Sequence, residues 1–383
     1  MKNIWKALSY VLVAAVASVT TLICCLVSQQ MNMGKLDELQ LILDRYFIGE
    51  VDQVRLEDAA AAAMVDALGD EWSYYMTPEE YVVHQEMMSN SYVGVGITVA
   101  TRDDLQGIDV LEAIKDGPAM EAGILAGDVI VAVDNTSLLG MDVNEAGTVI
   151  RGEEGTDVTL TVLREGQTLT FTMTRQKFET EVATYQMLEG NIGLITIENF
   201  DERCADETIR AVDALLNQGA KALIFDVRNN PGGYKHELVE VLDYLLPEGE
   251  IFHTEDCLGD EEVEYSDADY VDVPMAVLVN LSSYSAAEFF AAALDEYDAA
   301  IIVGEKTYGK GHFQVTLPLT DGSAVNLSVG KYYTPKGMSL AGVGLTPDVE
   351  VPVDEETARA ILSGTLAPEE DPQIQAAINA LFP

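Results

Sequence analysis

Three patterns of hydrophobic and polar positions follow one another along the chain. Between about residues 34 and 90, apolar residues recur at helical spacing, as at Leu36 and Leu39, and predict a helical region. Residues 91–176 form short apolar runs separated by glycine turns, which is typical of strands. From residue 190 onward, apolar strand runs alternate with amphipathic helical segments. This alternation predicts an α/β core with a largely parallel sheet.

The patterns divide the 383 residues into five predicted parts. These are an anchor or signal segment at 1–30, a helical region at 31–90, a small β-domain at 91–176, an α/β core at 177–354 and an acidic, partly helical tail at 355–383. No internal repeat is visible, so we expect each part to fold as a separate kind of structure.

The N-terminal segment contains an uncharged run from Ala7 to Val27, preceded by Lys2 and Lys6. At about 1.5 Å per residue, the run spans roughly 30 Å, the thickness of a bilayer core. Lysines before the run favour an N-terminus inside the cell and the rest of the chain outside. We therefore expect an uncleaved single-pass anchor. A cleaved signal peptide and lipidation at Cys24 remain the alternatives.

The composition is strongly acidic, with 21 Lys and Arg against 65 Asp and Glu and a net charge of −44. Such a surface repels phosphate, which argues against a nucleic-acid partner and against a basic patch for anionic lipids. The four cysteines have no C-x-x-C spacing. We expect Cys204 and Cys257 to remain separate, and a disulfide between them is the alternative.

The block 91–176 carries three features in a fixed order. A glycine loop spans Gly94–Ile97, a turn and short helix span Gly117–Gly123, and the segment Leu125–Ile130 carries the G-D-x-I pattern at the start of a strand. In this order the three features resemble a PDZ domain. The resemblance implies that peptide C-termini bind beside the glycine loop. The alternative is a small β-domain whose glycines only make turns.

A glycine loop of this kind can direct several backbone N–H groups at one carboxylate, and the adjoining strand edge can accept a peptide as an added strand. We expect the peptide-binding N–H groups to be those of Val95, Gly96 and Ile97. Arg151 is a weaker candidate for a contact that links the PDZ position to the active site.

A second segment contains candidate catalytic residues. It runs from the buried strand at Val277–Val279 through a turn of small residues into a helix. Ser285 would lie at the N-terminus of that helix. Unpaired N–H groups and the positive end of the helix dipole stabilise negative charge there. The alternative is a serine that merely caps the helix, which is common.

Gly304 through Lys310 fits the spacing of a nucleotide-binding P-loop, but the fit is misleading. Gly311 stands where the magnesium-binding Ser or Thr belongs, and a strand rather than a helix follows. We therefore expect no nucleotide cofactor. The carboxylates show no metal-ligand spacing either, so the sequence predicts no cofactor of any kind.

Lys310 is better explained as a general base. A lysine buried among apolar neighbours has a lowered pKa, and its neutral amine can remove a proton from a serine. The flanking glycines would let the backbone bring Lys310 close to Ser285, and Gln314 could orient the amine. The alternative is an exposed lysine in a loop.

Taken together, the motifs resemble the carboxyl-terminal processing, or tail-specific, proteases of serine peptidase family S41. The residues that carry the resemblance are Ser283-x-Ser285-Ala286-x-Glu288, Thr307 to Gly311, Gln314, Asp226 to Gly233 and Gly342 to Val349. The resemblance covers about residues 35–352. It implies a ClpP/crotonase-like α/β protease core with an inserted or preceding PDZ domain.

The resemblance also implies roles for single residues. Ser285 would be the nucleophile, Lys310 the general base and Gln314 the residue that positions Lys310. The backbone N–H groups of Gly233 and Ala286 would form the oxyanion hole, although the choice between Gly232 and Gly233 stays open. Tyr284, Ala287 and Tyr308 depart from the usual family residues without removing a catalytic group. Tyr284 could narrow the site.

A Ser-His-Asp triad is the obvious rival, and the chain has four histidines, His84, His236, His253 and His312. His312 is close to Lys310 in sequence. On an extended segment, however, it would lie about 6–7 Å further along the same face. We expect none of the histidines to act as the base.

The expected function is thus a membrane-anchored, extracytoplasmic serine endopeptidase that binds protein or peptide C-termini and cleaves upstream of them. A homo-oligomer is compatible with the sequence. The main alternative is a catalytically inactive PDZ scaffold on a protease fold, and a weaker one is another hydrolase, such as an esterase. Intact Ser285, Lys310 and Gln314 favour the peptidase.

Overall fold

The computed structural model describes residues 34–102 and 104–382. The chain divides into two compact units, Met1–Gly69 and Asp70–Pro383. The predicted membrane anchor at residues 7–27 lies outside the described residues. Among the helices that are described, none is both long enough and apolar enough to cross a bilayer.

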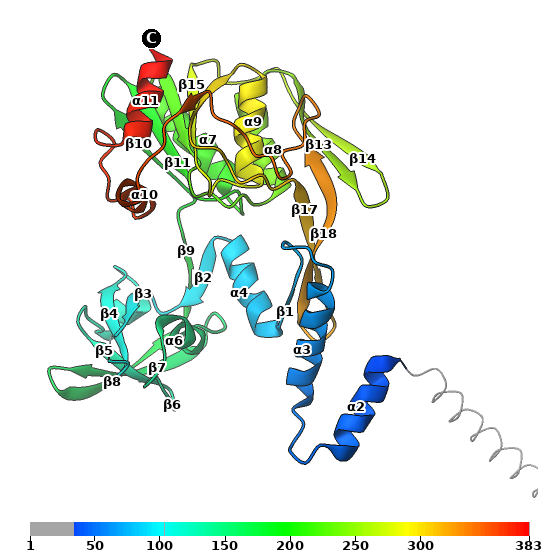
Figure 1. Cartoon of the computed structure of the whole chain (residues 1–383). Helices are drawn as coiled ribbons and strands as arrows, with labels where there is room; N and C mark the ends of the chain where they lie inside the picture. Colours follow the sequence, from blue (N-terminus) through cyan, green and yellow to red (C-terminus); the bar gives the residue numbers. More distant parts are fainter. Residues whose placement is uncertain (1–33, 103, 383) are drawn as a thin grey trace, which may run out of the picture. The chain divides into compact units, whose positions relative to one another are not determined.

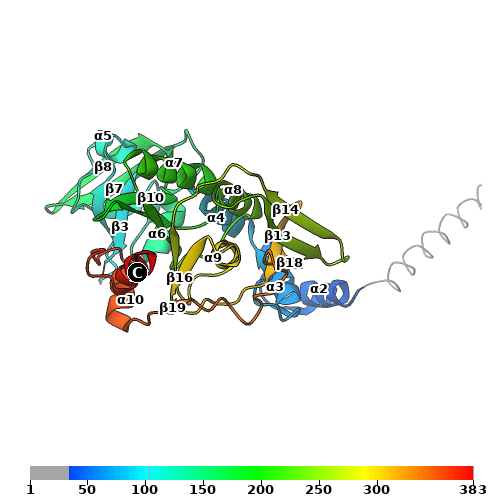
Figure 2. The same ribbon diagram turned by 90° about the horizontal axis from the view of Figure 1, so that it is seen from above.

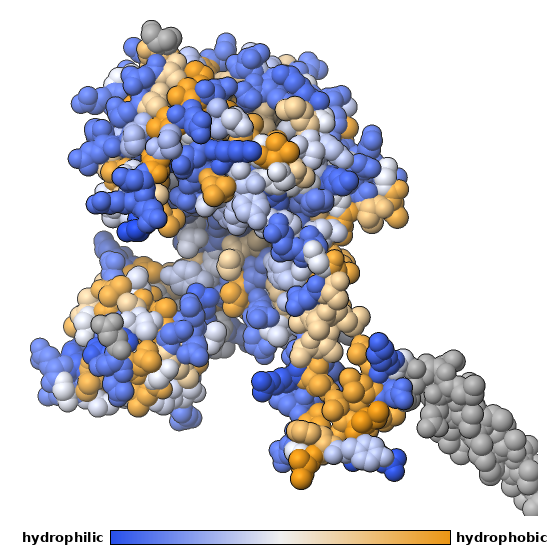
Figure 3. Space-filling view, in the orientation of Figure 1, coloured by the Kyte–Doolittle hydropathy of each residue, from blue (hydrophilic) through white to orange (hydrophobic). Residues whose placement is uncertain are grey.

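In the first unit, the structure describes two helices, α2 (Lys35–Tyr46) and α3 (Gln53–Asp66), as the apolar spacing predicted. The Asp52 side chain caps α3 by accepting a hydrogen bond from the Arg55 N–H at 3.1 Å. Neither helix buries a residue. Figure 3 shows apolar side chains gathered over α2 and α3, and these include Leu36, Leu39, Ile42, Val54 and Met64.

The second unit begins with a strand that the sequence analysis did not predict. Strand β1 (Tyr74–Met76) pairs antiparallel with β18 (Ala324–Tyr333). The prediction of an all-helical segment up to residue 90 is therefore wrong at these residues, because a distant strand supplies backbone partners that local spacing does not reveal. Helix α4 (Pro78–Met88) follows, and Thr77 and Glu80 form a capping box at its start.

The glycine-rich block folds as a β-domain with its own apolar core. Its strands are β3 (Ile97–Thr101), β4 (Ile108–Ala113), β5 (Val129–Val133), β6 (Thr136–Ser137), β7 (Asp157–Arg164) and β8 (Gln167–Thr174), and its helices are α5 (Pro118–Ala122) and α6 (Val143–Ile150). The sheet order is β3-β4-β5-β7-β8, with β6 on β5. The β7–β8 hairpin is confirmed, and β3 lies at the edge of the sheet.

The two ends of this domain lie side by side, because β2 (Ser91–Gly94) pairs antiparallel with β9 (Gln176–Glu179). The chain thus enters and leaves the domain at one place. Strand β10 (Ala183–Leu188) then leads into the α/β core. An inserted domain requires this arrangement. It also explains how β1, which precedes the domain in sequence, can pair with β18, which follows it.

The core contains a six-stranded sheet of order β10-β11-β12-β15-β16-β19. Its further strands are β11 (Ile192–Ile197), β12 (Ala222–Asp226), β15 (Met275–Val279), β16 (Ala300–Gly304) and β19 (Val349–Glu350). All neighbouring pairs are parallel except the β10–β11 pair. The predicted α/β core is confirmed, and its continuous apolar strands follow from burial on both faces.

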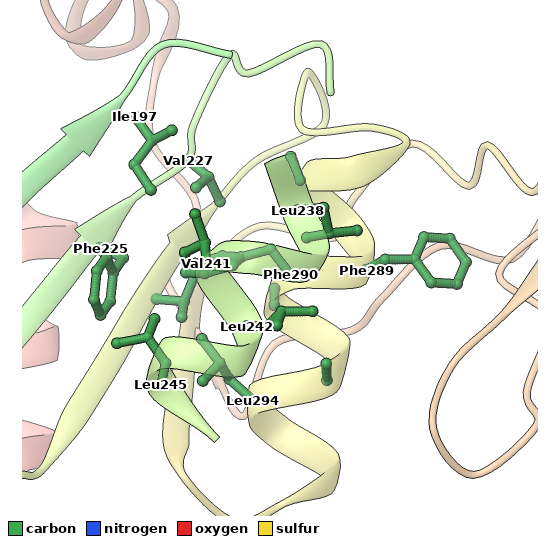
Figure 4. Packing of buried hydrophobic residues seen from close by; sticks show 14 of the residues in the cluster. Ile197, Phe225, Val227, Leu238, Val241, Leu242, Leu245, Phe289, Phe290 and Leu294 are labelled. Atoms are coloured by element: carbon green, nitrogen blue, oxygen red, sulfur yellow. The ribbon is translucent and has the colours of Figure 1, made fainter. Parts of the chain in front are cut away.

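Helices cover both faces of this sheet (Figures 1 and 2). On one face lie α7 (Cys204–Asn217), α8 (Lys235–Leu245) and α9 (Ala286–Glu296), and on the other lies α11 (Pro372–Leu381). Figure 4 shows Leu238, Val241 and Leu242 of α8 packed beside Phe290 and Leu294 of α9.

The C-terminal segment, predicted as an acidic and partly helical tail, contains two helices. After α10 (Glu355–Leu362), α11 buries Ile374, Ala377 and Leu381 against the sheet. Asp371 also forms a buried ion pair with Arg228, at 2.9 Å. The sequence analysis did not foresee this packing, because acidic residues around the helix outnumber the short apolar stripe inside it.

A second sheet of the core, of order β1-β18-β13-β14, carries β17 (His312–Pro318) as a branch on β18. The predicted hairpin across Asp321-Gly322 is confirmed as β17 and β18. Strands β13 (Gly249–Asp256) and β14 (Glu261–Ser266) form in the acidic stretch for which no strand was predicted. Cys204 is buried, Cys257 is exposed, and both are free thiols, as expected.

Candidate active site

Ser285 lies directly before helix α9, at the end of the loop that follows β15. Its backbone has φ 60° and ψ −126°. A positive φ is unfavourable for a residue with a Cβ, and such strain is concentrated at functional sites. Gly232 approaches so closely that a Cβ on it would lie 2.6 Å from the Ser285 Cβ. A glycine is therefore required opposite the serine.

Neighbouring polar groups fix the loop that presents Ser285. The hydroxyl of Ser283, which is fully buried, donates to the Val227 carbonyl at 2.7 Å. The Tyr284 N–H donates to the Asn230 carbonyl at 3.1 Å. These bonds join the nucleophile loop to the turn after β12, and they hold an otherwise unfavourable backbone in place.

The predicted oxyanion-hole donors lie at this junction. Within residues 104–382, the N–H groups of Gly233 and Ala286 have no hydrogen-bond acceptor, whereas the Gly232 N–H donates to the Asn230 Oδ1 at 2.8 Å. Ala286 is also the first residue of α9, where N–H groups point outward and favour negative charge. The geometry favours Gly233 over Gly232 as the donor. The assignment stays a prediction.

Lys310 lies in the loop between β16 and β17, flanked by the predicted glycines. Gly309 has φ 98°, and a Cβ on Gly311 would lie 2.5 Å from the Ala341 Cβ. The Lys310 Nζ lies 4.1 Å from the centroid of the Trp72 ring. Burial lowers the pKa of Lys310 from 10.5 to about 8, against the opposing effect of nearby carboxylates. A substantial neutral fraction therefore exists near neutral pH.

One buried carboxylate connects the serine to the lysine loop. Glu288, which is fully buried in α9, accepts the Ser285 N–H at 3.1 Å and the Lys310 N–H at 2.9 Å on the same oxygen. Its other oxygen accepts the Gly309 N–H at 2.7 Å and the Thr307 hydroxyl at 2.5 Å. Burial raises the pKa of Glu288 despite these four hydrogen bonds.

The Ser285 hydroxyl has a partner that the sequence analysis did not foresee. The hydroxyl of Tyr332, on β18, donates a hydrogen bond to the Ser285 Oγ at 3.0 Å. The serine is thus more than a helix cap, because its side chain is bonded to a residue far away in the sequence. No hydrogen bond between Ser285 and Lys310 side chains occurs among the described residues.

Gln314 and the histidines are the remaining groups that the sequence analysis considered for the active site. The Gln314 Nε2 donates to the His312 carbonyl at 2.9 Å and to the Ser328 Oγ at 3.1 Å. These bonds fix the amide of Gln314, while its positioning of Lys310 stays a prediction. All four histidines are described, and none is hydrogen-bonded to Ser285.

In the β-domain, Val95 and Gly96 form the turn that leads into the edge strand β3, which begins at Ile97. Their carbonyls accept the N–H groups of Ala119 and Ile114, both at 2.9 Å. Their own N–H groups have no acceptor in the described part of the domain. Gly96 has φ 75°, and a Cβ on it would lie 2.7 Å from the Phe178 ring. Binding of a peptide carboxylate by Val95, Gly96 and Ile97 stays a prediction.

Arg151 caps the C-terminal end of α6, and its guanidinium forms an ion pair with Glu86 of α4 at 3.4 Å. The side chain is 45% exposed, so this contact contributes little stability. The structure brings Arg151 to α4 and not to Ser285. A role in linking the PDZ domain to the active site stays a prediction.

Sequence reasoning assigned no role to Trp72, Asn230, Glu288 or Tyr332. Glu288 could have been found, because a serine followed three residues later by glutamate is the spacing of a capping box. Trp72 and Tyr332 could not, because their proximity to the site depends on the pairing of β1, β17 and β18.

This chain is similar to known proteases in sequence and in structure. The family model "Peptidase family S41" matches residues 191–351, and a PDZ domain model matches residues 110–164. A carboxy-terminal processing protease CtpA of Bacillus subtilis is 36% identical, over 79% of this chain and 65% of its own length. A probable CtpA-like serine protease of Staphylococcus aureus is 32% identical, over 88% of this chain and 68% of its own length.

The chain thus spans about two thirds of the length of these relatives. Among solved structures, a photosystem II D1 C-terminal processing protease is 28% identical, covers 89% of this chain and 93% of its own, and has a TM-score of 0.51. The predicted family and enzyme class are confirmed. This chain belongs to peptidase family S41, a family of serine-type peptidases, and carries a PDZ domain.

Proposed function

We propose that this chain is a serine endopeptidase in which Ser285 is the nucleophile and Lys310 the general base. The observation that carries the proposal is the single Glu288 oxygen that binds the N–H groups of both residues. A shared acceptor holds the nucleophile loop and the base loop in one fixed relation, which is what a two-residue catalytic group requires.

The reaction follows from the charges at the site. The neutral Lys310 amine takes the Ser285 proton as the Oγ attacks the peptide carbonyl. The oxyanion that forms accepts hydrogen bonds from Gly233 and Ala286 N–H groups, aided by the dipole of α9. The Lys310 ammonium then protonates the leaving amine. Water attacks the acyl-enzyme with Lys310 again as base, and the serine is restored.

The PDZ domain would select substrates with a free C-terminus. Unpaired N–H groups at Val95 and Gly96 suit a carboxylate, and the edge strand β3 suits a peptide that adds to the sheet. Cleavage upstream of the bound end would then follow from tethering, since a bound C-terminus raises the local concentration of the preceding segment at the active site.

The proposal places the catalytic unit outside the cytoplasm on an N-terminal anchor. The support is the uncharged run after Lys2 and Lys6 together with the acidic remainder of the chain. Removal of residues 1–30 should shift the protein from the membrane fraction to the soluble fraction. Retention of the truncated protein in membranes would contradict the anchor.

The experiment that tests the proposed activity is cleavage of an unstructured protein such as casein by the purified chain and by Ser285→Ala. The wild type should cleave and the folded variant should not. Ser282→Ala is the matched control at an exposed serine of the same loop, and it should cleave at about the wild-type rate. Equal cleavage by wild type and Ser285→Ala would contradict the assignment of the nucleophile. Binding of casein without cleavage by the wild type would instead favour an inactive PDZ scaffold.

A further inference from the structure

The apolar core around Tyr332 explains why an aromatic ring is buried there, but it does not explain why the ring carries a hydroxyl. Only 4% of the residue is exposed. The ring packs edge-on against Phe289 at 4.4 Å between centroids, and it also contacts Phe252 and Phe313. A phenylalanine would satisfy this apolar environment. A buried tyrosine hydroxyl, in contrast, needs a hydrogen-bond partner.

The partner of that hydroxyl is the Ser285 Oγ, at 3.0 Å. The backbone of the same residue also contacts the lysine loop, because the Tyr332 N–H donates to the carbonyl of Gly311, next to Lys310, at 3.4 Å. Tyr332 therefore touches both halves of the site. Its side chain reaches the nucleophilic atom, and its main chain holds the end of the loop that carries the base.

We propose that Tyr332 is a further catalytic residue of this peptidase, whose hydroxyl orients the Ser285 Oγ and donates a hydrogen bond to it during the reaction. The inference rests on the proposed roles of Ser285 and Lys310 and adds a third group to them. The Ser285 Oγ forms or breaks a bond in every step of the reaction. The tyrosine hydroxyl therefore contacts a reacting atom directly.

The hydrogen-bond capacity of a serine explains the orienting effect. A serine hydroxyl has one proton to donate and two lone pairs. Tyr332 occupies one lone pair, so the serine proton must point elsewhere and is available to Lys310. The second lone pair is left for attack on the carbonyl carbon. Burial raises the pKa of Tyr332, so its hydroxyl keeps its proton and remains a donor at any working pH.

The same bond becomes stronger when the acyl-enzyme breaks down. The bond between the carbonyl carbon and the Ser285 Oγ then breaks, and its electron pair moves onto the oxygen. The Lys310 ammonium returns a proton to that oxygen, so protons and charge balance without a transfer from Tyr332. A donor already in place stabilises the negative charge that develops on Oγ, because hydrogen bonds to charged oxygen are the stronger kind.

The test is the substitution Tyr332→Phe, which removes one oxygen and keeps the ring in its aromatic neighbourhood. The matched control is Tyr333→Phe, since the adjacent Tyr333 hydroxyl bonds Glu255 at 2.9 Å instead of the site. Two experiments are done on each protein and give three quantities. One measures the rate of covalent labelling of Ser285 by a fluorophosphonate, and the other measures kcat and KM for an unstructured peptide.

For Tyr332→Phe we expect kcat and the labelling rate to fall about 10- to 100-fold, the loss of one hydrogen bond to a charged oxygen. KM should stay within about twofold, because the hydroxyl does not bind substrate. Tyr333→Phe should match the wild type in all three quantities. A residue that only supports the core would change the unfolding temperature and leave the labelling rate of the folded protein unchanged.

A labelling rate and a kcat within about twofold of wild type in Tyr332→Phe would overturn the inference. Faster rates would overturn it too, because they would mean that the hydrogen bond inhibits the serine. If Tyr332→Phe does not fold, a crystal structure of the wild-type phosphonate adduct decides. The inference requires the Tyr332 hydroxyl within about 3 Å of Oγ and is overturned beyond about 4 Å. Ser285→Ala and Lys310→Ala are assayed in parallel. Cleavage above about a tenth of the wild-type rate by Ser285→Ala or Lys310→Ala would overturn the proposed function itself, whereas their inactivity beside a Tyr332→Phe with wild-type rates would overturn only the role of Tyr332.

Discussion

The amine of Lys310 lies 4.1 Å from the centroid of the Trp72 ring, within cation–π distance. The Trp72 ring also contacts the rings of Tyr284 and Tyr308, at 5.8 and 5.6 Å between centroids. Trp72 and Tyr284, whose ring centroid lies 6.0 Å from the Lys310 Nζ, thus shield the amine from water. Burial lowers the pKa of Lys310 to about 8, against the opposing charges of Asp70, Glu288 and Glu71.

This balance predicts a pH effect for Trp72→Ala. Only the neutral amine can act as a base, so the wild-type rate should rise with pH through an apparent pKa near 8. Removal of the indole admits water to Lys310, which moves its pKa back toward 10.5. We expect the acidic limb of the kcat/KM profile to move up by about one pH unit, with a slower reaction at pH 7. Trp72→Phe keeps the shield and is the control. A limb that stays in place or moves down would contradict this explanation of the lowered pKa.

Glu288→Gln should reduce activity more than stability. Both carboxylate oxygens accept hydrogen bonds, so an amide nitrogen on either side would face donors such as the Ser285 and Lys310 N–H groups. We expect kcat to fall at least about tenfold, since small displacements of catalytic groups are costly. Steady-state kinetics measure the effect. The control is Glu296→Gln at the other end of α9, which tests whether loss of any buried carboxylate of this helix lowers kcat. Wild-type kcat in Glu288→Gln would mean that the shared acceptor is not needed.

Gly96→Val should impair capture of substrate C-termini and leave the Ser285 site intact. The residue has φ 75°, and a Cβ would lie 2.7 Å from the Phe178 ring, so a branched side chain distorts the loop. We expect slower cleavage of free-acid peptides and unchanged labelling of Ser285 by a fluorophosphonate. Steady-state kinetics on matched free-acid and amidated peptides provide the comparison. Amidation should slow the wild type and have little further effect on Gly96→Val. Equal wild-type rates for free-acid and amidated peptides would contradict recognition of the substrate's C-terminal carboxylate.

Asp371→Ala should lower the stability of the protease core. The Arg228 guanidinium is buried between Asp226 and Asp371, and the Asp371 contact attaches the start of α11 to the sheet. Loss of one partner of a buried pair costs about 3–5 kcal/mol, and the remaining Asp226 favours the lower end. Urea unfolding measures the free energy, with the exposed Glu369→Ala as the control. A change below about 1 kcal/mol would show that α11 is held by its apolar face alone.

The sequence predicted those parts of the site that depend on short segments. Ser285 follows a buried strand and precedes a helix, and Lys310 lies between two glycines, so local spacing was sufficient to place them. Gly96 was predicted in the same way, because few residues other than glycine adopt its backbone conformation.

The contacts that complete the site depend on long-range pairing and could not be predicted. Tyr332 reaches Ser285, and Trp72 reaches Lys310, because β1 and β17 both pair with β18. The role of α11 was missed for a related reason. Acidic residues dominate the composition of its segment, whereas three residues on one face, including Ile374 and Leu381, decide its burial.

The most direct test of the central claim is the cleavage rate of Lys310→Ala relative to wild type, with the fold checked by circular dichroism. A general base contributes roughly 10²–10⁴-fold, so we expect at least a hundredfold loss of kcat/KM in a folded protein. Lys310→Arg should be nearly as inactive, because a guanidinium does not lose its proton near neutral pH. Activity above about a tenth of wild type in folded Lys310→Ala would contradict the assignment of Lys310 as the base.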